Sequence, residues 1–189
     1  MPVFLHGRLQ TLTGLLESSN AALRAYAALD LNTAGIVAAH LDEVGLAYQA
    51  LGMPDAENDA LVLSGQLVSA RRGWDPLALV RVTSHRREME RFVALRVLTQ
   101  AADRLRRERE EVEQRLSEAR DLLTPILLYA LQNNLLPKGR TEPDQAALER
   151  LWAALQKDPH TQTAARQLAM KVPSADVVVL MGDLLAALN

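Results

Sequence analysis

The sequence predicts an all-α protein, in which one or more helical bundles are organised around one long, partly coiled-coil central helix. Apolar residues recur at alternating spacings of three and four, which is the period of an amphipathic helix. Hydrophobic residues make up 49% of the chain but aromatic residues only 4%, so the core must consist mainly of Leu, Ala and Val. Alternating strand-like patterns are almost absent, and the prolines fall between periodic segments.

The periodic segments divide the 189 residues into three expected parts. Residues 1–73 are expected to form an N-terminal three-helix bundle, residues 74–136 the long central helix, and residues 137–189 a small C-terminal helical bundle. A chain of this length can bury a real core in one domain or in two small ones.

The N-terminal part contains three amphipathic patterns, at about residues 3–29, 33–51 and 55–72. The loop of residues 30–33 ends in the good N-cap residues Asn32 and Thr33 before the second helix, and Asp55 is placed to cap the third. The spacing of apolar residues from Leu41 to Tyr48 is similar to that in the first helix of a tetratricopeptide repeat. No second copy follows at a period near 34, so we expect Gly45 to serve ordinary packing between helices.

The central helix is expected from about Ser84 to Leu123, after a turn and a short helix that begins at Asp75-Pro76. It carries a heptad seam with one charged member, which we take as the candidate partner-binding surface: Leu95, Leu98, Ala102, Leu105, Arg109, Val112, Leu116 and Ala119. The seam is long and only thinly apolar, so we expect it to pair with a second copy or with a partner's helix rather than to be covered within one small globule.

Charged residues four apart, such as Arg106 and Glu110, can support the exposed faces of this helix. Pro125 either kinks the helix or starts a new one with Thr124 as its cap. The turns that follow, from Ile126 to Leu136, are apolar almost all round and are therefore expected to be buried.

Three shorter helices are expected in the C-terminal part. The first opens around Thr141–Asp144, the second at Thr161 or Thr163, and the third at Ser174. The run Val177-Val178-Val179 is the only strand-like segment, and the preceding Ser174 cap favours a helix there.

The formal net charge of −2 hides a strong separation of charge along the chain. Residues 1–70 carry a net charge of −5, residues 71–109 carry +6 from eleven arginines against five acidic residues, and residues 110–189 carry −3. The candidate basic surface comprises Arg71, Arg72, Arg81, Arg86, Arg87, Arg91 and Arg96. These arginines either meet acidic groups of the protein itself, within one chain or across an oligomer, or bind an external anion such as the phosphates of a nucleic acid. Trp74, beside Arg71 and Arg72, either anchors a partner by a cation–π contact or closes the end of the bundle.

No catalytic, cofactor or metal motif is visible. The chain lacks cysteine, and its nine glycines form neither a GxGxxG nor a GxxxxGK phosphate loop. His40, Asp42 and Glu43 are close in sequence, but their spacing converges poorly on a metal, so we interpret His40 as a surface or helix-interface histidine. The expectation is therefore no catalytic residue, no metal ligand and no cofactor.

These observations predict a non-enzymatic protein for helical protein–protein interaction or oligomerisation, either an adaptor or a structural protein. The alternative is a nucleic-acid-associated regulator that binds phosphates through the arginines of residues 71–109. The N-terminal residues lack the pattern of a signal peptide, and no run approaches a membrane span, so we expect a cytoplasmic protein without a membrane partner.

Overall fold

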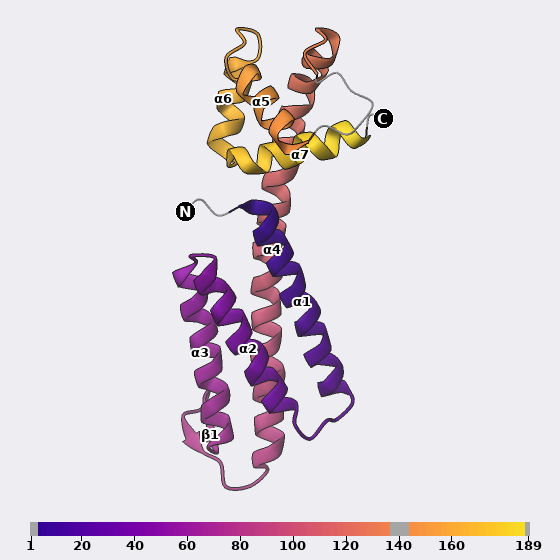
Figure 1. The fold of residues 1–189 in the computed structure, drawn as a ribbon. Helices are drawn as coiled ribbons and strands as arrows, with labels where there is room; N and C mark the ends of the chain where they lie inside the picture. The colour runs from indigo at the N-terminus through magenta and orange to yellow at the C-terminus, as the bar shows by residue number, and fades with distance from the viewer. Residues whose placement is uncertain (1–3, 137–143, 188–189) are drawn as a thin grey trace. The chain divides into compact units, whose positions relative to one another are not determined.

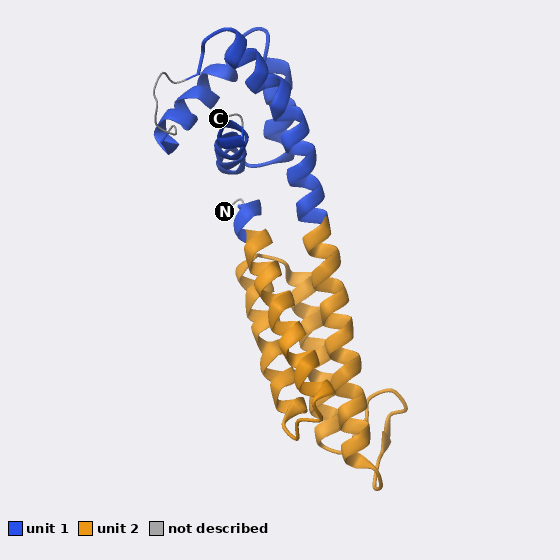
Figure 2. Cartoon of the chain, turned by 90° about the vertical axis from the view of Figure 1, so that its right-hand side faces the viewer, with its two compact units in different colours: residues 1–7, 111–189 blue, residues 8–110 orange. Residues whose placement is uncertain are grey.

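The computed structural model describes residues 4–136 and 144–187, and its seven helices confirm the all-α fold class (Figure 1). The elements are α1 (Leu5–Ala27), α2 (Thr33–Ala50), α3 (Pro54–Arg71), β1 (Trp74–Asp75), β2 (Val80–Arg81), α4 (Arg86–Gln132), α5 (Gln145–Leu155), α6 (Gln162–Lys171) and α7 (Ser174–Ala187). The chain divides into two compact units, shown in Figure 2: unit 1 comprises residues 1–7 and 111–189, and unit 2 residues 8–110. Helices α1 and α4 each contribute to both units, so the units do not follow the three segments expected from the sequence.

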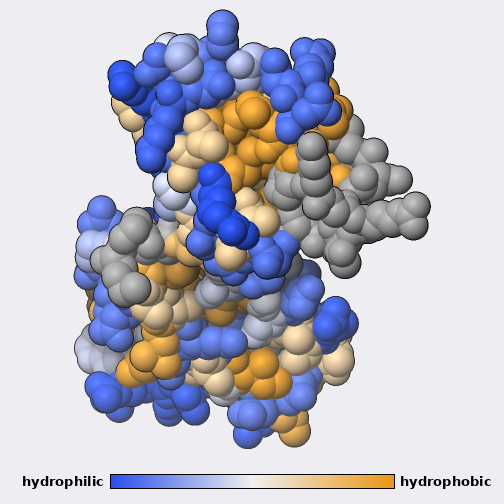
Figure 3. Space-filling model, turned by 45° about the horizontal axis from the view of Figure 1, so that its top comes forward, coloured by the Kyte–Doolittle hydropathy of each residue, from blue (hydrophilic) through white to orange (hydrophobic). Residues whose placement is uncertain are grey.

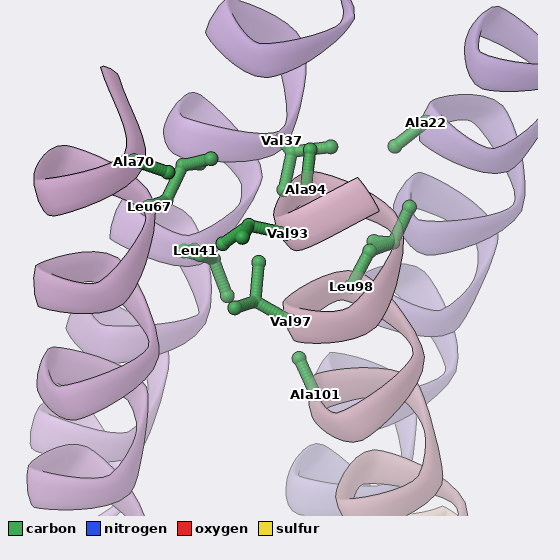
Figure 4. Close-up of a cluster of buried hydrophobic side chains, with 10 residues drawn as sticks. All are labelled: Ala22, Val37, Leu41, Leu67, Ala70, Val93, Ala94, Val97, Leu98 and Ala101. Carbon is green, nitrogen blue, oxygen red and sulfur yellow. The ribbon is translucent and has the colours of Figure 1, made fainter. Parts of the chain in front are cut away.

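Unit 2 is a bundle in which the first half of α4 packs with α1, α2 and α3. Figure 4 shows part of its core, to which all four helices contribute side chains: Ala22, Val37, Leu41, Leu67, Ala70, Val93, Ala94, Val97, Leu98 and Ala101. Helices α2 and α3 approach closely where Gly45 faces Ala60, since a Cβ built on Gly45 would lie 4.0 Å from that of Ala60. Gly45 thus serves the packing of two neighbouring helices.

A charged cluster inside unit 2 draws one residue or more from each of its four helices. Arg8 of α1 donates to Glu108 of α4 at 2.6 Å, and Arg104 of α4 is paired with Asp59 of α3. Arg104 also lies 3.8 Å from Glu108. Burial, with a contribution from the Glu108 carboxylate, raises the pKa of the nearby Tyr48 of α2 to about 12. The cluster therefore brings polar side chains from all four helices of the bundle together.

A β-hairpin stands where the sequence predicted a short helix at Asp75-Pro76, so that prediction is wrong. Gly73, with φ +83°, ends α3, and Trp74 pairs with Arg81 in the two-residue ladder. Asp75 does cap one turn, since its side chain accepts hydrogen bonds from the amides of Leu77 and Ala78 at 2.8 and 3.2 Å. That turn stops at Leu79, whose φ of +54° is left-handed and cannot propagate a right-handed helix.

Helix α4 runs without a break from Arg86 to Gln132, with Pro125 inside it. Thr124 is not an N-cap, because its hydroxyl donates to the Arg120 carbonyl at 2.8 Å within the helix. The all-round burial expected after Pro125 is only partly correct. Ile126 and Leu127 are buried, whereas Leu128, Leu131 and Leu135 are exposed.

Unit 1 packs α5, α6 and α7 around buried side chains that include Trp152, Leu168 and Met181. The third helix begins at Ser174 and continues through residues 177–179, as the sequence predicted. The fully buried Asp176 of α7 accepts hydrogen bonds from the first amides of α1, those of Leu5 at 2.9 Å and His6 at 3.0 Å. The His6 Nδ1 lies 2.7 Å from the same carboxylate. A side chain distant in sequence thus caps the N-terminus of α1.

Helix starts elsewhere follow local chemistry. Helix α5 begins after Asp144, whose side chain accepts from the amide of Ala147 at 2.7 Å. Helix α3 begins one residue before the expected cap Asp55, because Pro54 occupies the first helical position and Met53 the N-cap.

Candidate interaction surface

The heptad seam lies inside the folded chain. Leu98, Ala102, Leu105, Val112, Leu116 and Ala119 are all buried, and Leu95 and Arg109 are half-buried. The expectation that a small globule would leave the seam uncovered is therefore wrong. A helix stripe of this width was covered by the chain itself, so these residues form core rather than a free surface.

A different surface gathers at the end of unit 2 that holds the β-hairpin, and we call it the hairpin end (Figure 1). It combines the α1–α2 loop, the hairpin and the start of α4, and its exposed large apolar residues are Leu29, Leu31, Trp74, Leu77, Leu79, Val80 and Phe92. Leu31 is 99% exposed and Leu79 is 79% exposed.

Two exposed leucines of the hairpin end, Leu29 and Leu79, have strained backbone conformations. Leu29 and Leu79 have φ values of +59° and +54°, in the left-handed region that bulky side chains rarely adopt. The parts of the hairpin end are tied together at its base. Arg86 of α4 donates to the Arg71 carbonyl at the end of α3, and Val82 donates to the Gly73 carbonyl at 2.8 Å.

The α1–α2 loop closes the other side of this surface. A shallow groove of about 330 Å³ separates the loop from the start of α4, and it is lined by Asp30, Leu31, Thr33, Ala34, Arg87, Glu88, Glu90 and Arg91. The loop therefore lies beside the arginines at the start of α4.

Six of the seven arginines of the predicted basic surface fall into two groups. Some are held by the chain: Arg71 Nε lies 3.7 Å from Glu90, and Arg91 donates to the Tyr26 carbonyl at 3.3 Å, with its guanidinium 5.2 Å from the centre of that ring. Arg86, which donates to the Arg71 carbonyl, belongs to the same group. Arg96 belongs to neither group: it is half-buried and lies one helical turn after Phe92 in α4.

The second group is Arg72, Arg81 and Arg87, whose side chains are exposed. Within the described ranges, none of the three makes an ion pair or a side-chain hydrogen bond. The structure thus brings three uncommitted guanidinium groups and a set of exposed apolar side chains to the same end of the bundle. Trp74 is about half exposed there, so it does not close the bundle.

His40 lies between α1 and α2 in a buried hydrogen-bond network. Its Nε2 is 2.8 Å from the Ser19 hydroxyl and its Nδ1 3.1 Å from the Ser18 hydroxyl, which donates to Glu43 at 3.0 Å. Burial lowers the pKa of His40, although the Glu43 carboxylate partly opposes the shift.

This network contains the residue types of a nucleophile and a base, but its geometry is structural. Ser19 and His40 are 1% and 3% exposed, so a substrate cannot reach them. The Ser19 hydroxyl also donates to the Leu15 carbonyl at 3.0 Å, which leaves its proton committed to the helix. His40 is therefore a helix-interface histidine.

A groove between α3 and α4 has no net charge by which to select a ligand. It has a volume of about 610 Å³, is open, and is lined by three acids and three arginines: Asp59, Asp103, Glu110, Arg104, Arg106 and Arg107. Arg106 pairs with Asp103 at 2.7 Å rather than with the predicted Glu110. Among the residues that the structure describes, no cluster of three or more His, Asp or Glu side chains could hold a metal ion.

Unit 1 also exposes apolar side chains, and Figure 3 shows hydrophobic residues gathered in a hollow of the molecule's upper part. A groove of about 290 Å³ in unit 1 is lined by Leu135, Ala147, Arg150, Leu151 and Ala154.

Comparison of the chain with known proteins finds no matching family, no matching curated protein and no matching solved structure. None of the helices in the described ranges has the length and apolar character needed to cross a membrane. The hairpin end was missed in the sequence because its apolar residues follow no helical period. A usable signal was present in the two leucines that flank Asp30 and in the apolar run from Leu77 to Val80, both between periodic segments.

Proposed function

We propose that this chain is a non-enzymatic protein for protein–protein interaction or oligomerisation, and that it binds its protein partner through the hairpin end. The observation that carries the proposal is the shared location of exposed leucines and of arginines without an acidic partner in the described chain. Arginine and aromatic residues are enriched at protein interfaces, and contiguous exposed apolar residues on a soluble domain commonly mark a binding site.

The chemistry of this surface defines the partner's chemistry. Leu79 and Trp74 supply apolar area, and Arg81 and Arg87 need carboxylates beside it. A complementary surface would therefore present exposed aliphatic side chains flanked by Asp or Glu. Such charge complementarity steers association and sets the register of the two surfaces.

A nucleic-acid-associated regulator remains the second candidate, because Arg72, Arg81 and Arg87 are exposed and can reach phosphates. The leucines between the arginines favour the protein partner, since aliphatic side chains contribute nothing to phosphate contacts.

Site-specific photo-cross-linking in cells tests the proposal. A photoreactive amino acid replaces Leu79, and the matched control carries it at Met170 of unit 1, which is 80% exposed against 79% for Leu79. We expect protein adducts from position 79 that are lost on adding Arg81→Gln and Arg87→Gln, and no equivalent adduct from position 170. Nucleic-acid adducts from position 79 would favour the second candidate, and the absence of any macromolecular adduct there would overturn both.

A further inference from the structure

The outer side of α2 and α3 carries a second apolar surface of opposite charge. A groove of about 290 Å³ runs between the two helices, and we call it the acidic groove. Leu46 and Leu61 on its rim are 67% and 61% exposed. Asp42 and Glu57 also line it, and neither side chain has an ion pair or hydrogen bond within the described residues.

Two small residues, Gly45 and Ala60, meet at the floor of the acidic groove. Gly45 and Ala60 let α2 and α3 approach, so the leucines on either side stand above the floor. Among the described residues, the only charged side chains that line the acidic groove, Asp42 and Glu57, are both acidic. The acidic groove therefore offers exposed leucines flanked by carboxylates, which is the chemistry that the hairpin end requires.

We infer that the hairpin end of one copy of this chain docks on the acidic groove of a second copy. Leu79 packs against Leu46 and Leu61, while Arg81 and Arg87 meet the carboxylates beside them. The inference rests on the proposed role of the hairpin end and names its partner. It also gives partners to charges that the described part of one copy leaves unpaired, because Arg81 and Arg87 would meet Asp42 and Glu57.

The two surfaces cannot meet within one copy. The acidic groove is lined by α3 residues from Glu57 to Ser64, whereas the hairpin is anchored beyond Arg71 at the end of the same helix. Ten residues of helix separate Leu61 from Arg71, a rise of about 15 Å. The strands start three residues later, and Arg86 at the start of α4 ties that helix to the Arg71 carbonyl at the end of α3.

A contact between two different surfaces is heterologous, and it leaves one free surface of each kind at the ends of the assembly. Association therefore continues with concentration, either into a closed ring or into an open chain of copies. A symmetric dimer, in which the same patch meets itself, would stop at two copies. The dependence of mass on concentration therefore distinguishes a heterologous contact from a symmetric dimer.

Two double variants each remove one surface by exposed substitutions that leave the core intact. The end variant carries Leu79→Asn and Arg87→Gln, and Asn suits the left-handed backbone at this position. The groove variant carries Asp42→Asn and Leu46→Gln. Circular dichroism and thermal unfolding establish that both variants fold like the wild type.

Sedimentation velocity and light scattering measure the mass of the full chain over a wide range of concentration. We expect the wild-type mass to rise with concentration above 20.8 kDa, and the rise to be lost between about 0.1 M and 1 M salt, where the Debye length falls from about 10 Å to 3 Å. Each variant alone is expected to stay monomeric. An equimolar mixture of the two should form a dimer of about 42 kDa and go no further, because it retains one intact pair of surfaces.

A wild type that is monomeric at all concentrations would overturn self-docking. So would variants that associate as the wild type does, or an associating wild type whose two variants fail to pair when mixed. The proposed function fails separately: protein adducts at position 79 with a different protein, together with a monomeric wild type, would leave the hairpin end as an interaction surface for another partner.

Discussion

Replacing Asp176 by Ala removes the cap that joins the end of α1 to α7. The carboxylate is fully buried and accepts three hydrogen bonds, from the amides of Leu5 and His6 and from the His6 ring. It also lies in the first turn of α7, so the N-terminal ends of two helices both stabilise its negative charge. The substitution leaves the buried Leu5 amide without its acceptor.

The expected loss of stability follows from the groups that lose their hydrogen-bond acceptor. Loss of an N-cap acceptor costs about 0.5–2 kcal/mol, and a hydrogen bond to a charged group contributes about 1.5–3 kcal/mol. Removal of the buried charge offsets part of this loss of stability, because the carboxylate no longer has to be desolvated. We expect a net loss of about 2–4 kcal/mol, and about half of that for Asp176→Asn, which keeps one acceptor oxygen in place.

Urea unfolding followed by circular dichroism measures the loss, and amide hydrogen exchange locates it. In the wild type the Leu5 and His6 amides should exchange slowly, and in Asp176→Ala they should exchange as fast as unprotected amides. The control is Asp183→Ala, which removes an exposed carboxylate from the same helix and should change stability by less than about 0.5 kcal/mol. Equal stability of the two variants, or unchanged protection of Leu5, would refute the assignment of Asp176 as the cap.

Three further predictions concern unit 2. Leu105→Ala should lower the free energy of unfolding by about 3–5 kcal/mol at any protein concentration, because Leu105 is fully buried. If stability fell only at concentrations where the protein associates, Leu105 would instead belong to a partner-binding seam. Because burial lowers the pKa of His40 below 6.5, the unfolded chain takes up this proton more readily, so stability should be full above pH 6.5 and decline as the pH falls toward the lowered pKa. His40→Gln should flatten that slope in unfolding curves from pH 7.5 to 5.5, and an unchanged slope would contradict the role of His40. Gly73→Ala should cost about 1–2 kcal/mol, because φ there is +83° and the new Cβ would lie 3.3 Å from Arg86 Nε. Gly65→Ala, with nothing within 4 Å in mid-helix, should instead add about 0.5–1 kcal/mol, and the same sign for both glycines in thermal unfolding would argue against a backbone cause.

Local features of the sequence predicted most helices well, because periodicity and caps act within a few residues. Helix α2 was expected from the end of the 30–33 loop to about Leu51 and runs from Thr33 to Ala50, and α7 begins at Ser174, the residue expected as its cap. The predictions that failed concern segments whose structure depends on residues that are neighbours in space. Asp75 capped a turn as expected, but the left-handed Leu79 and the pairing of Trp74 with Arg81 turned that segment into a hairpin.

The heptad seam shows the same limit on a larger scale. Spacing establishes which face of a helix is apolar, but it does not reveal which surface covers that face. In α4 the face with Leu98 and Leu105 is buried in the folded chain. The narrow stripe therefore could not distinguish a coiled coil between two chains from the core of a single one.

The fate of each arginine depended on residues far away in sequence, which is why only part of the basic surface is available to a partner. Arg71 meets Glu90, nineteen positions away, and Arg104 meets Asp59, forty-five positions away. Arg81 and Arg87 have no such acid within the described chain, although residues 1–70 carry an excess of them. Two of those acids, Asp42 and Glu57, line the groove between α2 and α3 and make no ion pair or side-chain hydrogen bond within the described residues. The docking proposed above would pair these two sets of charges between copies, at the end of the bundle rather than along its longest helix.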